Sequence, residues 1–448
     1  TDSTSHADLW LQIRPGTDCA LALGMIHHIM EEDLYDKEFV KKWCYGFDQL
    51  KTWVQSYPID RVAEITWIPG PKIRQAAEWY ATLTPGVTNH GMGLEHQANS
   101  IQALHAHYIL SAITGNIDIP GGDIFPSPYP NLIHEQEIAA HDRLSTQQIG
   151  KTLGIDRFRL MSRQGYDAVQ SQVLKAWGRA ANNRSSYECY AHAPTVYRAI
   201  LSGKPYPVRA MITLSSNPMI TQANTKLVYE ALKSLDLYVV VDFFMTPSAQ
   251  LADYVLPSTS YLERPWLWTY SGIVGSERAM PRKIEGEYDR RDDYDIWRGL
   301  ALQLRQGKDW PWETLEEVYD YRLKPIGLTF QDFMSRGGFL SIPKEHKRYE
   351  KVGFGTPTGK IEIYSKTLEK LGYHPLPEFK EPPESPYSRP DLAKEYPLIL
   401  ITGGRFQPYY HSEHRQVQSL REMHPDPIVQ IHPKTTKQLG IQEGDWVW

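Results

Sequence analysis

The chain has 448 residues, of which 41% are hydrophobic and 23% are charged, and its formal net charge is -5. This composition is typical of a folded globular protein, and the length exceeds what one hydrophobic core supports, so roughly three domains are expected. The charge balance gives no electrostatic sign of binding to nucleic acid or to an anionic membrane. No stretch reaches the ~18 successive apolar residues of a membrane span, so no direct membrane span is predicted.

The first predicted unit is a strand, a turn and a helix. The apolar residues 9–13 predict the strand, Pro15-Gly16-Thr17-Asp18 predicts the turn, and residues 19–32 predict an apolar helix. Asp18 stands where a side chain can cap the first turn of that helix. Strand–turn–helix units of this kind indicate the layers of an α/β fold.

A second unit of the same kind follows. Residues 86–90 predict a strand and Gly91-Met92-Gly93 predicts a turn. The helix after the turn is indicated by apolar residues at helical spacing, and the glycine- and proline-rich residues 114–122 end it. The apolar positions of this helix are Ile101, Leu104, Tyr108, Ile109, Ala112 and Ile113.

A third unit contains two strands joined by a helix. Residues 208–214 and 237–241 predict the strands, and 253–257 predict another short strand. A helix between successive strands predicts a parallel pair with a right-handed crossover. Ligands of such sheets bind at the carboxyl ends of the strands, so Asn217 and Asp242 are candidate binding residues.

The last part of the chain predicts a linker and a new domain. Residues 381–397 are rich in proline, glutamate, serine and lysine, and residues 398–402 predict a strand that begins the new domain. The cysteines stand alone in the sequence, without the close spacing of cluster ligands, and are expected to be small core residues. They are Cys19, Cys44 and Cys189.

Taken in order along nearly the whole chain, these turns and strand ends resemble the dimethyl sulfoxide reductase superfamily of molybdopterin oxidoreductases. The superfamily includes formate dehydrogenases and nitrate reductases, and the chain looks acetylene-hydratase-like or polysulfide/thiosulfate-reductase-like. The motifs that carry the resemblance are Ala7-Asp8-Leu9 through Pro15-Gly16-Thr17-Asp18, Gly91-Met92-Gly93 with His96, Thr114-Gly115-Asn116-Ile117, Ser216-Asn217-Pro218, Asp242 with Ala252-Asp253-Tyr254-Val255-Leu256-Pro257, Leu262-Glu263-Arg264, and Thr402-Gly403-Gly404-Arg405 with His411-Ser412.

The resemblance implies an α/β fold with two Rossmann-like domains of the dimethyl sulfoxide reductase type. We expect the first at residues 1–126 and the second at 127–307, the second interrupted by an excursion near 265–290. A connecting and covering region is expected at 308–390. Residues 394–448 are expected to begin a C-terminal, β-barrel-like domain that binds the molybdopterin dinucleotide.

The cofactor that the resemblance implies is bis(molybdopterin guanine dinucleotide) with molybdenum or tungsten. The family's metal ligand lies upstream of the region beginning here, as would any four-iron four-sulfur cluster, so no metal ligand is expected within this chain. The expected cofactor-binding residues are Thr17, Asp18, Met92, Gly93, His96, Asn217, Val241, Asp242, Arg264, Asp295, Thr402, Gly403, Arg405, His411 and Ser412.

The charged side chains among these residues suit the guanine base and the phosphates of the dinucleotide. A guanine edge offers N1–H and N2–H together, and a carboxylate accepts both, which is the expected role of Asp18, Asp242 and Asp295. Arg264 and Arg405 offer guanidinium groups to phosphate oxygens.

Three uncharged polar residues add to the expected contacts. Thr17, with the backbone N–H groups at the start of the following helix, suits an anionic diphosphate, and Asn217 suits a ribose or phosphate. Many members of the superfamily carry glutamine where this chain has His96. His96 is the candidate catalytic residue, although a hydrogen bond to the pterin is favoured over direct proton transfer.

The substrate is expected to differ from formate. Formate dehydrogenases that resemble this chain carry an arginine where Pro128 stands here, beside Phe125 and Tyr129. The approach to the metal should therefore be more apolar and lack a fixed positive charge. A small neutral or soft substrate, such as an alkyne or a polysulfide, then loses less hydration energy on binding than a carboxylate.

The function that the sequence indicates is the central part of the catalytic subunit of a molybdenum or tungsten oxidoreductase, as used in anaerobic respiration. The expected partners are a small-molecule substrate and an electron-transfer subunit, with no nucleic acid, and both cytoplasm and periplasm stay open. A non-redox hydratase, in which the metal activates water, is an alternative. A nucleotide-binding module without catalysis is another. A zinc hydrolase at His134 and His141 is disfavoured, because Ile138 occupies the position where the zinc motif needs its second histidine.

Overall fold

A computed structural model describes residues 2–125, 129–138, 144–160, 162–165, 167–169, 190–269, 276–341, 344–402, 409 and 414–447. By their internal contacts these residues form two units, Thr1–Pro382 and Pro383–Trp448. In this part of the chain, every helix is too short or too polar to cross a membrane.

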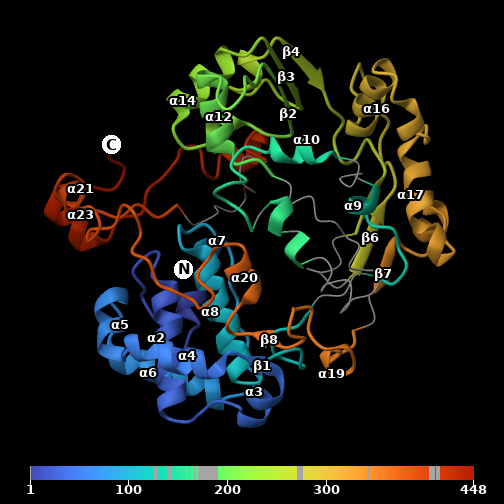
Figure 1. Cartoon of the computed structure of the whole chain (residues 1–448). Coiled ribbons are helices and arrows are strands. Elements are labelled where there is room, and N and C mark those ends of the chain that lie inside the picture. Colours follow the sequence, from blue (N-terminus) through green and yellow to red (C-terminus); the bar gives the residue numbers. More distant parts are fainter. Residues whose placement is uncertain are drawn as a thin grey trace. The chain divides into compact units, whose positions relative to one another are not determined.

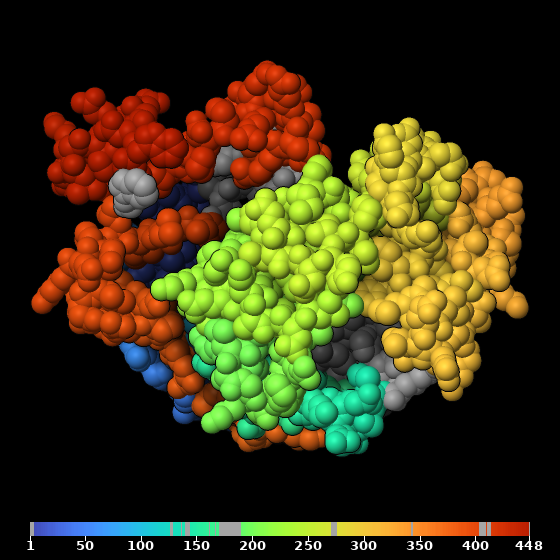
Figure 2. Space-filling view, turned by 90° about the horizontal axis from the view of Figure 1, so that it is seen from above, coloured from blue at the N-terminus to red at the C-terminus, as the bar shows by residue number. Residues whose placement is uncertain are grey.

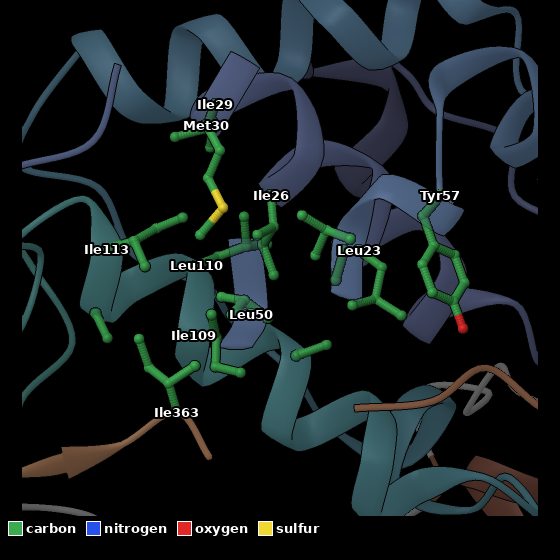
Figure 3. Packing of buried hydrophobic residues seen from close by; sticks show 14 of the residues in the cluster. Leu23, Ile26, Ile29, Met30, Leu50, Tyr57, Ile109, Leu110, Ile113 and Ile363 are labelled. Atoms are coloured by element: carbon green, nitrogen blue, oxygen red, sulfur yellow. The ribbon is translucent and has the colours of Figure 1, made fainter. Parts of the chain in front are cut away.

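Helix α2 (Asp18–Glu31) is the centre of the first hydrophobic core (Figure 1). The helix is apolar on nearly every side, and such helices are buried in a protein interior. Its Leu23, Ile26 and Ile29 are fully enclosed by the surrounding helices (Figure 3). The other helices of this core region are α3 (Lys37–Trp43), α4 (Phe47–Trp53), η1 (Val54–Ser56), α5 (Ile59–Thr66), α6 (Gly70–Thr82), α7 (Met92–Glu95) and α8 (Ser100–Ile113), and the short strand β1 (Cys44–Tyr45) follows α3.

A segment far along the chain completes this core. Strand β8 (Ile361–Glu362) pairs in parallel with β1. The first core also contains the buried residues Tyr349, Ile363 and Leu376, so the chain returns to this core after residue 341. The helices of this segment are α19 (Tyr349–Val352) and α20 (Lys366–Lys370).

A three-stranded parallel sheet forms a second core. Its strands β2 (Ala210–Leu214), β3 (Leu237–Asp242) and β4 (Tyr254–Pro257) lie in the order β2-β3-β4. Helices α12 (Ala193–Ser202) and α14 (Thr225–Lys233) pack on one face of the sheet, and the short helix α13 (Pro218–Thr221) follows β2 (Figure 1). The parallel pair joined by a helix is as the sequence predicts. In the space-filling view the segments from β2 to β4 form one continuous surface in yellow-green (Figure 2).

A third core lies around an antiparallel sheet of β5 (Trp266–Trp268), β6 (Ser276–Met280) and β7 (Phe339–Ser341). Leu267, Leu323 and Phe333 are buried there. The described strands of the chain thus belong to separate sheets, while the boundaries at residues 126, 307 and 390 stay predictions. The remaining elements up to this point are α1 (Asp2–Ser5), α9 (Glu135–Ile138), α10 (Thr146–Gly150), η5 (Ala249–Leu251), α16 (Asp293–Gln303), η6 (Gly307–Asp309), α17 (Leu315–Leu323), η7 (Lys324–Ile326) and α18 (Phe330–Ser335).

The second unit is helical where it is described. Its helices are α21 (Pro390–Glu395), α22 (Gln418–Arg421) and α23 (Pro433–Leu439). The strand expected at 398–402 is absent, because within the described ranges no neighbouring strand pairs with these residues, and their side chains from Leu398 to Ile401 are exposed.

Two other strand predictions were wrong for the same reason. Residues 9–13 and 86–90 alternate between more and less buried side chains, as a strand does, but no described strand pairs with either of them. The prediction that Asp18 caps the following helix was also wrong. Thr17 occupies the capping position and Asp18 is the first residue of α2.

Candidate cofactor site

The carboxyl edge of the parallel sheet brings together predicted residues from two loops. Parallel strands end at the same edge, so the loop after β2, with Asn217, and the last residue of β3, Asp242, face the same side of the sheet. The buried Ser248 joins these loops, since its hydroxyl donates to Asn217 Oδ1 over 2.7 Å. The backbone N–H of Met219 donates to Ser248 Oγ at 3.1 Å.

Asp242 keeps one carboxylate oxygen available at this edge. The residue is half-buried, and its Oδ1 accepts the backbone N–H groups of Phe243 at 2.7 Å and Phe244 at 3.2 Å. Its Oδ2 accepts no hydrogen bond from any described residue. Phe243, Phe244 and Met245 are all more than half exposed. An open acceptor beside apolar surface fits a planar ligand that carries paired donors on one edge.

Val241 has a different place in the structure. Its side chain is 1% exposed, and its carbonyl oxygen accepts the backbone N–H of Ser215 at 3.1 Å. Val241 therefore holds the edge of the sheet together and does not present its side chain to solvent.

The same edge continues to the start of helix α16. Ser258 follows β4, and its hydroxyl donates to Asp293 Oδ1 at 3.0 Å. Arg264 is half-buried and its Nη1 lies 4.0 Å from Asp293 Oδ2. Asp292 caps α16 by accepting the backbone N–H of Asp295 at 3.0 Å. Partial burial and the charge of Asp292 raise the pKa of Asp295, which lies in the first turn of α16.

An ion pair between the buried Glu263 and the partly exposed Arg290 fixes the loop that carries Arg264. Glu263 is 3% exposed, and its Oε1 lies 2.7 Å from Arg290 Nη2. Its Oε2 accepts the backbone N–H of Ser260 at 2.8 Å, and this hydrogen bond lowers the pKa of Glu263. Sequence reasoning missed the linking residues Ser248 and Ser258. For Ser258 a signal was present, because it directly follows a predicted strand.

A second group of predicted residues lies at the start of α2. The turn before this helix packs against the side chain of Gln97: a Cβ on Gly16 would lie 3.2 Å from Gln97 Oε1, and Gly16 has a φ of +81°. Thr17 is buried and its hydroxyl donates to the carbonyl of Arg14 at 2.7 Å. Burial raises the pKa of the neighbouring Asp18 carboxyl. The structure thus brings the Thr17 turn next to the loop that follows α7.

Met92, Gly93 and His96 lie in and just after α7 and are exposed. The loop is held by Gln97, whose side-chain amide donates to the carbonyl of Gly93 at 3.0 Å. His90 lies behind it, with its Nε2 2.9 Å from the hydroxyl of Tyr108. The exposed side chains of Met92 and His96 can therefore contact a ligand without breaking an existing bond to a described residue.

A polar cluster that the sequence did not indicate fixes the loops around Asp123. The Ser111 hydroxyl donates to Asp123 Oδ2, and the Thr88 hydroxyl donates to the same oxygen at 3.1 Å. Burial lowers the pKa of nearby His107 to about 4.

Phe125 borders a cavity of about 80 Å³ that combines aromatic and charged residues. The ring of Phe354 lies 6.0 Å from that of Phe125 and 4.7 Å from that of Tyr349. The cavity is not free of charge, since Arg348 and Asp118 line it as well. Pro128 lies outside the described residues, and Tyr129 packs against the third core.

Several other predicted residues are not tested by geometry. Gly403, Arg405, His411 and Ser412 lie outside the described residues, as do Cys189 and His141, while Thr402 is exposed in the second unit. Cys19 and Cys44 are buried, as expected, and burial raises the pKa of Cys44 to about 12.

Residues 1–303 match the family described as molybdopterin oxidoreductase, and residues 398–448 match the molydopterin dinucleotide binding domain. The chain belongs to the molybdopterin oxidoreductase family. The cofactor this implies is a molybdenum or tungsten bis(molybdopterin guanine dinucleotide).

The relatives of this molybdopterin oxidoreductase chain differ in chemistry. It is 38% identical over 450 residues to acetylene hydratase of Syntrophotalea acetylenica, covering 100% of this chain and 61% of that protein. It is 26% identical to the molybdopterin-containing subunit of thiosulfate reductase of Salmonella typhimurium, over 99% of this chain and 59% of that protein. The chain thus spans about three fifths of the length of these relatives.

A solved structure confirms the expected fold class. Acetylene hydratase from Pelobacter acetylenicus superposes with a TM-score of 0.93 at 37% identity, over 100% of this chain and 61% of that chain. The mixed helix and sheet architecture is therefore that of the dimethyl sulfoxide reductase type.

Proposed function

We propose that the full-length protein is a hydratase that adds water to a small alkyne at a pterin-bound tungsten or molybdenum, and that this chain holds the nucleotide tails of the cofactor. The observation that carries the proposal is the similarity to acetylene hydratase, which runs through the whole chain at 38% identity and reaches a TM-score of 0.93. The thiosulfate reductase subunit matches 99% of this chain at only 26% identity.

The sheet edge supplies the nucleotide contacts in this proposal. Asp242 Oδ2 accepts N1–H and N2–H of one guanine, while Asp242 Oδ1 stays bound to its own turn. Asn217, held by Ser248, presents its amide N–H group to ribose or phosphate oxygens. Arg264 is anchored near Asp293 and offers its guanidinium to the diphosphate.

The turn before α2 contributes in another way. The Thr17 hydroxyl already donates to the carbonyl of Arg14, so an anionic diphosphate there is bound by the backbone N–H groups at the start of the helix. Met92 and His96 are exposed for contact with the pterin, and His96 donates or accepts a hydrogen bond there.

The bound metal would act as a Lewis acid toward water. Hydration of acetylene adds one water molecule across the triple bond and yields acetaldehyde, so no electrons are gained or lost. The aromatic rings around Phe125 suit an uncharged substrate. Arg348 and Asp118 in the same cavity carry opposite charges, so together they add no net charge to it.

A second candidate is an oxidoreductase that reduces a sulfur compound with electrons from a partner subunit. It is favoured by the match to the thiosulfate reductase subunit over 99% of this chain.

An assay of the anaerobically purified full-length protein separates the candidates. We expect acetylene-dependent formation of acetaldehyde, detected by NADH oxidation with added alcohol dehydrogenase, and no need for an electron donor. Thiosulfate-dependent oxidation of reduced viologen without any acetaldehyde would favour the oxidoreductase. Neither activity in metal-loaded protein would contradict both candidates.

A further inference from the structure

The carboxyl end of helix α2 gathers metal-binding side chains that the cofactor site does not use. His28, Glu31 and Glu32 each offer one ligand atom, and these atoms lie within 4.8 Å of one another. In the sequence His27-His28 precedes Glu31-Glu32 by four residues, which places each histidine beside a glutamate on the helix surface.

A glutamate of the neighbouring helix contacts the buried His28. Glu78 belongs to α6, which packs against α2 (Figure 1). Its Oε1 lies 3.1 Å from Nε2 of the buried His28. The side chains of Glu31 and Glu78 are 60% and 51% exposed, so an ion can reach the group from solvent.

A buried nitrogen without a hydrogen bond faces Glu31, one member of this group. His27 is 7% exposed, and no described residue forms a hydrogen bond with its Nδ1. This atom lies 3.9 Å from Glu31 Oε2. A small shift of Glu31 lets Nδ1–H donate to one carboxylate oxygen while the other binds an ion, as outer partners of metal ligands commonly do.

The electrostatics also favour a cation. Glu31, Glu32 and Glu78 place three carboxylates around one imidazole, and they do so at the negative end of the α2 dipole. A divalent ion relieves their mutual repulsion. A site of oxygen ligands alone would suit magnesium or calcium, whereas the imidazole nitrogen favours a transition ion such as zinc.

We propose that His28, Glu31, Glu32 and Glu78 bind a divalent transition metal ion of the zinc class, separate from the pterin-bound metal. His27 orients Glu31 from behind. The ion joins the carboxyl end of α2 to α6 and so stabilises the first core. This proposal is independent of which reaction the full-length protein catalyses.

The test is zinc binding by the full-length holoenzyme. After removal of loosely bound metal, the protein is equilibrated against Zn²⁺, and zinc, molybdenum and tungsten are counted by mass spectrometry. We expect one more zinc per chain in the wild type than in His28→Ala. Glu31→Gln and Glu32→Gln, which change exposed side chains, should weaken this zinc by about 10- to 100-fold.

The matched control is Glu38→Gln, an exposed glutamate on the next helix. This variant should bind zinc as the wild type does. Zinc should raise the melting temperature of the wild type and of Glu38→Gln, but not that of Glu31→Gln. Equal zinc in the wild type, His28→Ala and Glu31→Gln would overturn the proposal, as would an equal loss in Glu38→Gln. Because the glutamate variants leave the core unchanged, a folding failure of His28→Ala does not affect this outcome.

Discussion

Replacing Asp242 by asparagine separates its two roles. In the structure Oδ1 accepts two backbone N–H groups at 2.7 and 3.2 Å, and an amide oxygen can still accept both. The other atom of the group changes from an acceptor into an N–H₂ donor. It would then face the N1–H and N2–H donors of the guanine that we assign to this position.

The two effects have different sizes. The turn loses only the charge of its acceptor in a half-buried place, which we estimate at about 1 kcal/mol of folding stability. The cofactor loses a charge-assisted hydrogen bond and gains a donor–donor contact, about 2–4 kcal/mol in all. At about 1.4 kcal/mol per factor of ten, this weakens binding by roughly 30- to 1,000-fold.

The assay counts guanine nucleotide and metal released per full-length polypeptide after mild denaturation. Asp253→Asn is the control, because Asp253 Oδ2 accepts the backbone N–H of Tyr238 at 2.7 Å at the opposite edge of the same sheet. We expect both variants to melt slightly earlier and only Asp242→Asn to lose cofactor. Equal cofactor content in the two variants would refute the assignment of Asp242.

Three further changes test the fold around the site, each by thermal melting. Arg14→Met should lower the free energy of unfolding by about 2–3 kcal/mol, because the buried guanidinium donates to Glu381 at 2.5 and 2.9 Å. The substitution leaves behind the Glu381 carboxylate, whose side chain is only 28% exposed. A loss of stability no larger than for an exposed arginine would contradict this prediction. Gly46→Ala should lower the free energy of unfolding by at least about 2 kcal/mol, since Gly46 has a φ of +89° and a Cβ there would clash with Tyr364 Cβ. An unchanged melting temperature would contradict this prediction. Burial lowers the pKa of His134 from 6.5 to about 4, so as the pH falls the unfolded chain takes up this proton before the folded protein does. The free energy of unfolding should therefore fall between about pH 6.5 and pH 4, by at most about 1.4 kcal/mol per pH unit. His134→Asn should flatten this slope, and an identical slope in the variant would show that His134 does not cause it.

The parts of the fold that sequence predicts well are those whose pattern is complete within a short segment. Strands β2, β3 and β4 and the helix between the first two lie within 48 residues, and their apolar runs and turn residues indicate each element. Asn217 and Asp242 could be placed at one edge because parallel strands share it.

The failures come from contacts between distant residues. Residues 9–13 and 86–90 have the alternation of strands, but a strand also needs a partner, which local pattern does not reveal. Arg348 shares a cavity with Phe125 although more than 200 residues separate them, so the charge beside Phe125 could not be predicted from its neighbours in sequence.

A structure of the full-length protein with its cofactor tests the central claim most directly. We predict that one guanine places its N1 and N2 atoms about 3 Å from Asp242 Oδ2, with Asn217 on the adjoining ribose or phosphate. Two guanines that both lie away from Asp242 and Asn217, with the sheet edge covered by protein alone, would contradict it.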